Sequence, residues 1–242
     1  MTTTFKSITL LALALLFAGT ALSQQVLKIT YDRKTNLLKK FKDDGDMNEW
    51  LKDIDQKVRV DAFELFVTDS MSLFRPVASD LQERWSWMTA KNIVYQDFAN
   101  QKRYTIKDFW GEELHISDSL YVRKWKISSS TRKIAGYTCR KALWQANDST
   151  RLYAWFSYDL PVSTGPESFN GLPGTILGLA TEDGGVVYFA KKIEYVVPSP
   201  GTLEKPKKKK VQQANVLKAD LTKQYGKEKW FKRVYLEHFG IW

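Results

Sequence analysis

The chain has 242 residues and a formal net charge of +10, and 43% of its residues are hydrophobic, including nine Trp, eleven Tyr and thirteen Phe. This composition excludes a wholly disordered chain and supplies enough apolar material for a core. The positive charge favours contact with anionic surfaces such as lipid headgroups or acidic glycans.

Residues 1–23 have the pattern of a signal peptide. Lys6 precedes an apolar stretch from Ile8 to Phe17, and Ala21 and Ser23 provide the small residues of a cleavage site. The stretch is shorter than the ~20 residues that cross a bilayer, and no later stretch approaches that length. Cleavage near Ser23 predicts a periplasmic or secreted protein with no transmembrane segment in the mature chain. Outside the cytoplasm, nucleic acid is not an expected partner.

Alternating apolar and polar residues predict strands along most of the remaining chain. The segments are Val26–Tyr31, Val58–Val67, Asn92–Phe98, Tyr104–Phe109, Leu114–Ser117, Val122–Ile127, Thr138–Ala146, Arg151–Leu160, Thr175–Thr181 and Val186–Tyr195. The Asp-Gly-Gly run before Val186 predicts a hairpin. Many short strands with brief connections indicate a mainly β fold, an antiparallel meander that forms a curved sheet or half-barrel with one or two helices.

Two helices are expected beside the sheet. Asp46 and Glu49 have the spacing of a capping box and lead into the apolar side chains of Trp50 and its neighbours. A second helix is predicted from Val211 to about Gly226, where apolar residues recur at helical spacing.

The composition changes near Val197 and divides the mature chain. A β-rich domain is expected over residues 24–197, a Pro- and Lys-rich linker over 198–210, and a helix with a tail over 211–242. The linker includes the basic run Lys205–Lys210. That run is either a solvated connection or a contact for an anionic surface.

The segment from Ser168 to Leu179 combines turn residues with an apolar tail. Pro173 sets φ for the second position of a turn and Gly174 accepts a positive φ at the third, which predicts a type II turn. The segment resembles the signature of the GLPGLI family of secreted Bacteroidetes proteins, although Thr175 replaces the usual Leu. The matching motif residues are Gly171, Leu172, Pro173, Gly174 and Ile176.

The resemblance continues on both sides of this motif. Trp125, the run from Lys133 to Ala142, Ala154-Trp155 and Gly165-Pro166 have the order and spacing of the family's second half. The family has no established activity, so the resemblance provides no catalytic or ligand residue. Its glycines either permit turns and close backbone approach or, at Gly178, open space beside a cavity.

No residue pattern indicates a catalytic centre, a metal site or a cofactor. His115 and His238 are far apart and lack the paired spacing of metal ligands. Cys139 is the only cysteine, so no internal disulfide can form. We interpret it as a buried structural thiol, with a nucleophile, a soft metal ligand or an intermolecular disulfide as alternatives.

Three functional hypotheses follow. The first is a non-catalytic envelope protein that binds an apolar or amphipathic ligand, or a partner, on the concave face of the sheet. Its candidate lining residues are Trp50, Trp85, Trp87, Trp125 and Trp155, which are otherwise core residues. The second is a structural or assembly partner of an outer-membrane complex that uses an exposed GLPG turn and the basic tail. The third is a hydrolase with dispersed carboxylates.

Overall fold

The computed structural model describes residues 25–55, 57–78, 85–109, 111–147, 150–207, 210–228 and 231. The expected signal peptide and the last part of the C-terminal tail lie outside these residues. The strands are β1 (Val26–Asn36), β2 (Val58–Val67), β3 (Met71–Pro76), β4 (Ile93–Asp97), β5 (Lys102–Phe109), β6 (Glu112–Ser119), β7 (Lys126–Ile134), β8 (Tyr137–Asn147), β9 (Thr150–Ser157), β10 (Thr175–Thr181), β11 (Val186–Val196) and β12 (Val211–Gln213). The helices are α2 (Leu37–Lys40), α3 (Gly45–Lys52) and α4 (Ala214–Tyr225), with a 3₁₀ turn at Ser86–Met88.

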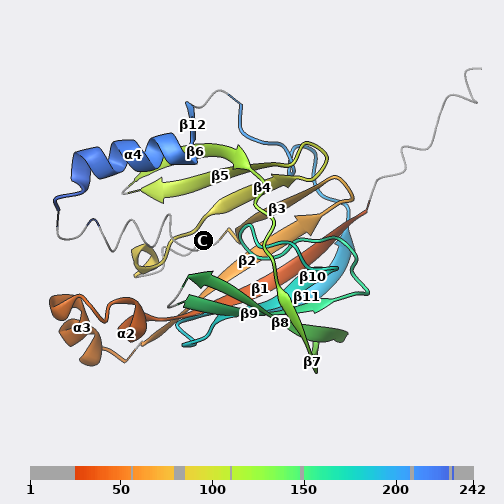
Figure 1. Cartoon of the computed structure of the whole chain (residues 1–242), viewed down its shortest axis with the longest axis horizontal. Coiled ribbons are helices and arrows are strands. Elements are labelled where there is room, and N and C mark those ends of the chain that lie inside the picture. The colour runs from red at the N-terminus through yellow and green to blue at the C-terminus, as the bar shows by residue number, and fades with distance from the viewer. Residues whose placement is uncertain are drawn as a thin grey trace, which may run out of the picture.

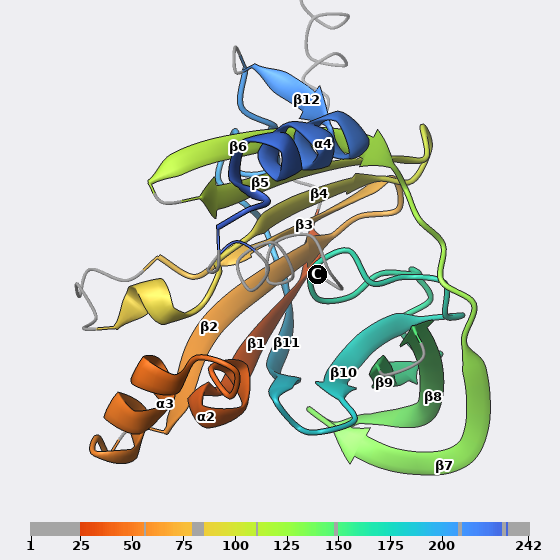
Figure 2. The same cartoon turned by 60° about the vertical axis from the view of Figure 1, so that its left-hand side comes forward.

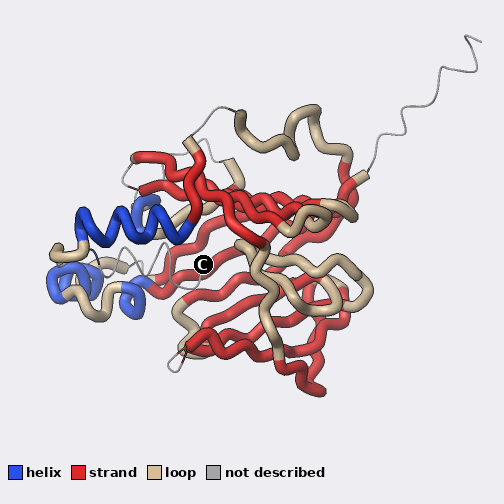
Figure 3. Tube along the Cα trace, turned by 45° about the horizontal axis from the view of Figure 1, so that its top comes forward, coloured by secondary structure: helices blue, strands red, loops and turns tan. Residues whose placement is uncertain are grey.

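All of these strands belong to one open sheet (Figure 1). Its order is β12-β6-β5-β4-β3-β2-β1-β11-β10-β9-β8-β7, so two antiparallel meanders meet where β1 pairs with β11. Only β12 pairs in parallel, with β6, among the ladders of the described residues. The predicted fold class is therefore confirmed: the structure is mainly β, largely antiparallel and strongly bent. The helices gather toward one end of the molecule (Figure 3).

Several of the predicted strands are confirmed. The bounds of β2 and β10 agree with the sequence pattern, and the expected hairpin joins β10 to β11. The strand predicted from Val122 to Ile127 is wrong over most of its length, because β7 begins only at Lys126. The residues before Lys126 cross from one half of the sheet to the other (Figure 2).

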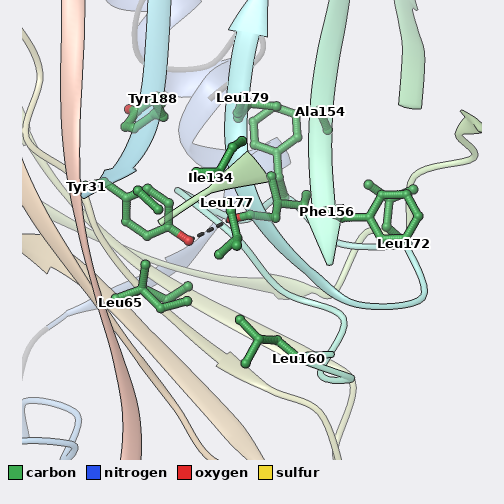
Figure 4. Close-up of a cluster of buried hydrophobic side chains, with 14 of the residues drawn as sticks. Tyr31, Leu65, Ile134, Ala154, Phe156, Leu160, Leu172, Leu177, Leu179 and Tyr188 are labelled. Atoms are coloured by element: carbon green, nitrogen blue, oxygen red, sulfur yellow. Dashed lines mark hydrogen bonds between the residues drawn. The ribbon is translucent and has the colours of Figure 1, made fainter. Parts of the chain in front are cut away.

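The main core lies between the two halves of the sheet. It contains Ile29 and Tyr31 of β1, side chains from β2, β3 and β8 to β11, and three residues of the connection between β9 and β10. Those three are Leu160, Phe169 and Leu172, and Figure 4 shows two of them beside the strands. The connection thus fills the space enclosed by the curved sheet (Figure 2). Consecutive residues of β10 from Thr175 to Leu179 are buried, as expected for a strand covered on both faces.

The first predicted helix is present, but its cap was misplaced. Asp44, not Asp46, is the N-cap of α3, and its side chain accepts a hydrogen bond from the Met47 backbone NH at 3.2 Å. Glu49 does not complete a capping box, because its carboxylate pairs with Lys52 at 2.7 Å. Leu51 is the buried residue of this helix.

The predicted C-terminal helix is present and docks onto the sheet, but it begins at Ala214 and not at Val211, because residues 211–213 form β12. β12 pairs with β6 at the register Val211 to His115, and α4 follows immediately. Leu217 and Leu221 of α4 pack with Phe109, Leu114 and Ile116 in a second cluster. Within the described residues, no helix combines the length and the apolar character needed to cross a bilayer.

Candidate functional site

The structure brings together three of the five tryptophans proposed as lining residues. Trp50 of α3 meets Trp85 edge to face at 4.7 Å between ring centroids, and Trp85 lies 6.5 Å from Trp87. We call these three residues the Trp cluster. Trp50 and Trp85 are half-buried, while Trp87 is 64% exposed. An exposed indole beside two partly covered ones forms an apolar surface that solvent can reach.

Local backbone geometry produces this arrangement. Trp85 has a φ of 72°, in the left-handed region, where a bulky residue is uncommon. The 3₁₀ turn that follows is tied to α2, because the Lys40 ammonium group donates to the carbonyl oxygen of Met88. Met88 is fully buried with Leu37 and Leu51 beneath the Trp cluster. Trp87 lies within this turn and Trp85 immediately precedes it.

The other two tryptophans lie elsewhere. Trp125, in the crossing segment before β7, donates its indole NH to the carbonyl oxygen of Asn170 at 2.8 Å. Trp155 of β9 lies beneath two cations, Arg132 at 5.0 Å and Lys141 at 5.7 Å from its ring centroid. The five tryptophans therefore do not line one common surface.

The GLPG motif is an interior feature. Of the residues from Gly171 to Ile176, only Pro173 is exposed, so the expected exposed GLPG turn is wrong. The turn type also differs from type II: the Gly174 NH donates to the Leu172 carbonyl oxygen at 2.8 Å, which closes a γ-turn around Pro173. The next NH, of Thr175, donates to Leu160 at 2.7 Å and starts the return into β10.

Close packing explains the motif glycines. A Cβ atom on Gly174, whose φ is 153°, would collide with the carbonyl oxygen of Ser157. One on Gly171, whose φ is 94°, would collide with the carbonyl oxygen of Arg123. Near Gly178 the closest atoms belong to Ile134 and Trp155, at 3.2 and 3.5 Å from such a Cβ. The space beside Gly178 is thus occupied by side chains.

A buried polar network ties the connection between β9 and β10 to both halves of the sheet. Glu167, at a φ of 57°, accepts hydrogen bonds from Tyr188 at 2.7 Å and from Asn92 at 2.9 Å. Burial and the charge of Glu167 raise the pKa of Tyr188, which keeps this phenol protonated. Farther along, the side chain of Asn170 donates to Gln96 at 3.1 Å, and Gln96 donates to Ser72 at 3.2 Å.

A second buried network crosses β1 and β2. Asp61 accepts hydrogen bonds from Arg33 at 2.8 Å, Arg59 at 2.8 Å and Thr89 at 2.7 Å. Arg33 lies over the Phe63 ring at 4.7 Å. Burial raises the pKa of Asp61, but the charge of Arg33 and the hydrogen bonds hold it below its usual value. The network keeps Thr89 and the Trp cluster next to the sheet. Sequence analysis missed it, because Arg33 and Asp61 meet only through the β1–β2 register.

Cys139 and His115 occupy interior positions. Cys139 is fully buried, and burial raises its pKa to about 11 against an opposing effect from Arg132. The Nδ1 atom of His115 lies 2.6 Å from the Tyr104 hydroxyl, and its Nε2 atom lies 3.3 Å from a carboxylate oxygen of Glu113. Across the described parts of the chain, no group of three or more His, Cys, Asp or Glu residues is arranged to hold a metal ion.

Comparisons with known proteins found a family model similar to the motif region and solved structures with a similar fold. Residues 145–178 match a family model described as a protein of unknown function, Porph_ging, and no curated protein matches the chain. Two solved structures of PNGF-II, in the P21 and C2 space groups, are similar, each with a TM-score of 0.56, at 17% and 18% identity. Both matches cover 81% of this chain. They cover 33% and 32% of the PNGF-II chains, so this chain spans about a third of the length of PNGF-II. At this identity the likeness shows the fold alone, while the matched residues 145–178 make the motif region of this chain similar to Porph_ging.

Proposed function

We propose that the protein is a non-catalytic binding protein that takes an apolar or amphipathic ligand at the Trp cluster. The observation that carries the proposal is Trp87, which presents 64% of its surface to solvent while touching a second indole. Exposed aromatic side chains held on a fixed base are typical of binding surfaces. The base here is the buried group of Leu37, Phe41, Leu51 and Met88.

This proposal moves the binding site away from the concave face of the sheet. The connection between β9 and β10 fills that face with Leu160, Phe169 and Leu172. The Trp cluster, in contrast, lies at the helical end, where Lys40 of α2 donates to the Met88 carbonyl oxygen. An amphipathic ligand would lay its apolar part on the indoles and turn its polar part toward solvent.

The proposal also includes export of the protein to the envelope and its membership of the GLPGLI family. The pattern of residues 1–23 supports export, and the match of residues 145–178 includes the motif from Gly171 to Gly174. A role as assembly partner is the second candidate. Its support is the exposed lysines Lys205, Lys207 and Lys210, which precede edge strand β12. Replacing these three lysines with Gln leaves α4 in place, and unchanged envelope association of that variant would count against this role.

Tryptophan fluorescence tests the Trp cluster directly. Dodecyl maltoside below its micellar concentration is titrated into the full chain, with maltohexaose as the sugar that lacks an acyl chain. We expect a saturable change in emission with the amphiphile, and its loss in Trp87→Ala. Tyr195→Ala is the matched control, because Tyr195 is 62% exposed on β11 and lies outside the cluster. Equal binding by both variants, or no response to either probe in the parent chain, would refute the proposal.

A further inference from the structure

Two guanidinium groups meet at one serine of the connection between β9 and β10. Arg103, from β5, donates through Nη1 to the Ser168 hydroxyl at 3.0 Å. Arg123, from the segment that crosses to β7, donates through Nη1 to the Ser168 carbonyl oxygen at 2.8 Å and through Nη2 to its hydroxyl at 3.4 Å. Two like charges are thus held together by neutral oxygen atoms.

The carboxylates near this pair are exposed or engaged with other groups. The charge of Glu167 opposes the lowering of the Arg103 pKa by burial, but the two Glu167 oxygens accept hydrogen bonds from Tyr188 and Asn92. Asp118 touches Arg103 alone, through one contact of 3.4 Å, and its side chain is 42% exposed. Arg123 is only 4% exposed, and among the described residues no carboxylate lies within 4 Å of it. Its neighbours are aromatic faces, Phe169 at 3.9 Å and Trp144 at 5.1 Å. A buried charge normally pairs with an opposite charge, so the environment of Arg123 lacks an expected component.

Arg33 provides a comparison inside the same protein. It is also buried, but it pairs with Asp61 at 2.8 Å, and its pKa is raised. Burial and the nearby charge of Arg103 instead lower the pKa of Arg123 to about 9. The two arginines therefore have similar burial and opposite electrostatic environments. A bound anion would give Arg123 an opposite charge, as Asp61 already gives Arg33.

Unused donors at the pair indicate the chemistry of the missing component. The Nε atoms of Arg103 and Arg123 are both buried, and neither has a hydrogen-bond partner within the described structure. A guanidinium group has five NH donors in a planar fork, whose geometry matches the oxygens of a carboxylate, phosphate or sulfate. The Nε of Arg33 is buried without a partner as well, although Arg33 has its carboxylate, so an open Nε does not by itself distinguish the pair. The excess positive charge distinguishes it, and an oxyanion would meet that charge and the open donors together.

We propose that Arg103, Arg123 and Ser168 form a binding site for an oxyanion, either a free small anion or the anionic group of a larger ligand. Approach is from the side of Arg103, whose side chain is 21% exposed, and of Tyr121, whose ring lies 5.5 Å from the Arg123 guanidinium and is 56% exposed. An arriving anion competes with Asp118 for Arg103 and adds the charge that Arg123 lacks. This site is separate from the Trp cluster and does not depend on it.

Titration calorimetry and thermal unfolding of the full chain test the site. Sodium phosphate, sulfate and acetate are added at constant ionic strength against chloride, and hexyl phosphate is the probe for an anion carried on an apolar group. We expect saturable binding and a matching rise in melting temperature with at least one oxyanion. Arg103→Gln and Arg123→Gln should weaken binding by about tenfold or more, and Asp118→Asn should strengthen it.

Controls separate a binding role from a structural one. Arg132→Gln removes an exposed arginine that also lies over aromatic rings, and it should bind like the parent chain. If Arg123→Gln does not fold, Ser168→Ala and Asp118→Asn still report on the site. Hexyl phosphate binding more tightly than inorganic phosphate would identify a headgroup, and equal affinities would identify a free anion. The absence of saturable oxyanion binding by the parent chain, or equal loss in Arg132→Gln, would overturn the proposal.

Discussion

Tyr31 of the first strand donates its hydroxyl to the carbonyl oxygen of Ile176 at 2.7 Å, across 145 positions of the chain (Figure 4). The bond reaches β10 at the register shift that follows Ile176 in its ladder with β9. A bulge interrupts the regular ladder, so a side chain can satisfy a carbonyl oxygen there. Burial raises the pKa of Tyr31 well above its usual value, which keeps the donor protonated.

Tyr31→Phe should destabilise the protein by about 1–3 kcal/mol, because it removes the donor and leaves the Ile176 oxygen buried. Urea unfolding at neutral pH measures the change. Tyr153→Phe is the matched control, since the exposed Tyr153 hydroxyl donates to Glu182 at 2.7 Å and its loss should change stability by less than about 0.5 kcal/mol. Equal effects of the two substitutions would contradict the importance of this bond.

Gly171→Ala and Gly174→Ala should each cost at least about 2 kcal/mol. Both glycines have positive φ, and a Cβ atom on either would collide with a carbonyl oxygen. Gly45→Ala is the control, because nothing lies within 4 Å of the added atom at this first residue of α3. It should be neutral or stabilise the protein by up to about 1 kcal/mol. Unfolding midpoints in urea distinguish these outcomes, and a silent Gly174→Ala would refute the packing argument.

The strand pattern predicted most of the sheet because alternation records burial on one face. It missed β3, whose consecutive buried residues Ser72, Leu73 and Phe74 do not alternate. It also misplaced the start of β7, whose residues are nearly all exposed. The crossing segment contains Val122, which is 56% exposed, and Trp125, which packs against the connection between β9 and β10 through contacts distant in sequence.

The sites were less predictable than the strands. Composition pointed to tryptophans, but only the fold shows that Trp50 and Trp85 meet and that Trp155 lies elsewhere. The arginine pair left no pattern in the sequence, since Arg103 and Arg123 contact a common serine, Ser168, far along the chain. Such a pair depends on tertiary contacts, which residue spacing alone does not encode.

Stability should decrease in acid partly through Asp61. Its pKa is lowered in the folded protein, so its contribution is complete above the unfolded value and is lost as pH falls through the folded value. Asp61→Asn should cost about 3–5 kcal/mol at neutral pH, since it leaves Arg33 and Arg59 without their carboxylate. The deficit should shrink at about pH 3. Urea unfolding at both pH values measures it, and a deficit independent of pH would contradict the ion-pair account.

Cys139 should not react with a thiol-specific disulfide reagent while the protein is folded. Its side chain is fully buried, and its pKa of about 11 means that at about pH 8 only about one thiol in a thousand is ionised. In urea above the unfolding midpoint, one thiol per chain should react promptly. Rapid stoichiometric labelling without urea would contradict this burial and restore the alternatives of a nucleophile or an intermolecular disulfide.

Docking of α4 can be tested at two adjacent residues of the helix. Leu217 is 4% exposed and packs with Phe109, Leu114 and Ile116, whereas Val216 is 48% exposed. Leu217→Ala should therefore destabilise the protein by about 2–4 kcal/mol, and Val216→Ala by less than about 0.5 kcal/mol. Hydrogen exchange of the α4 amides should accelerate in Leu217→Ala alone if the helix opens as a local unit. Equal exchange in both variants would show that α4 is held by β12, whose pairing with β6 neither substitution touches.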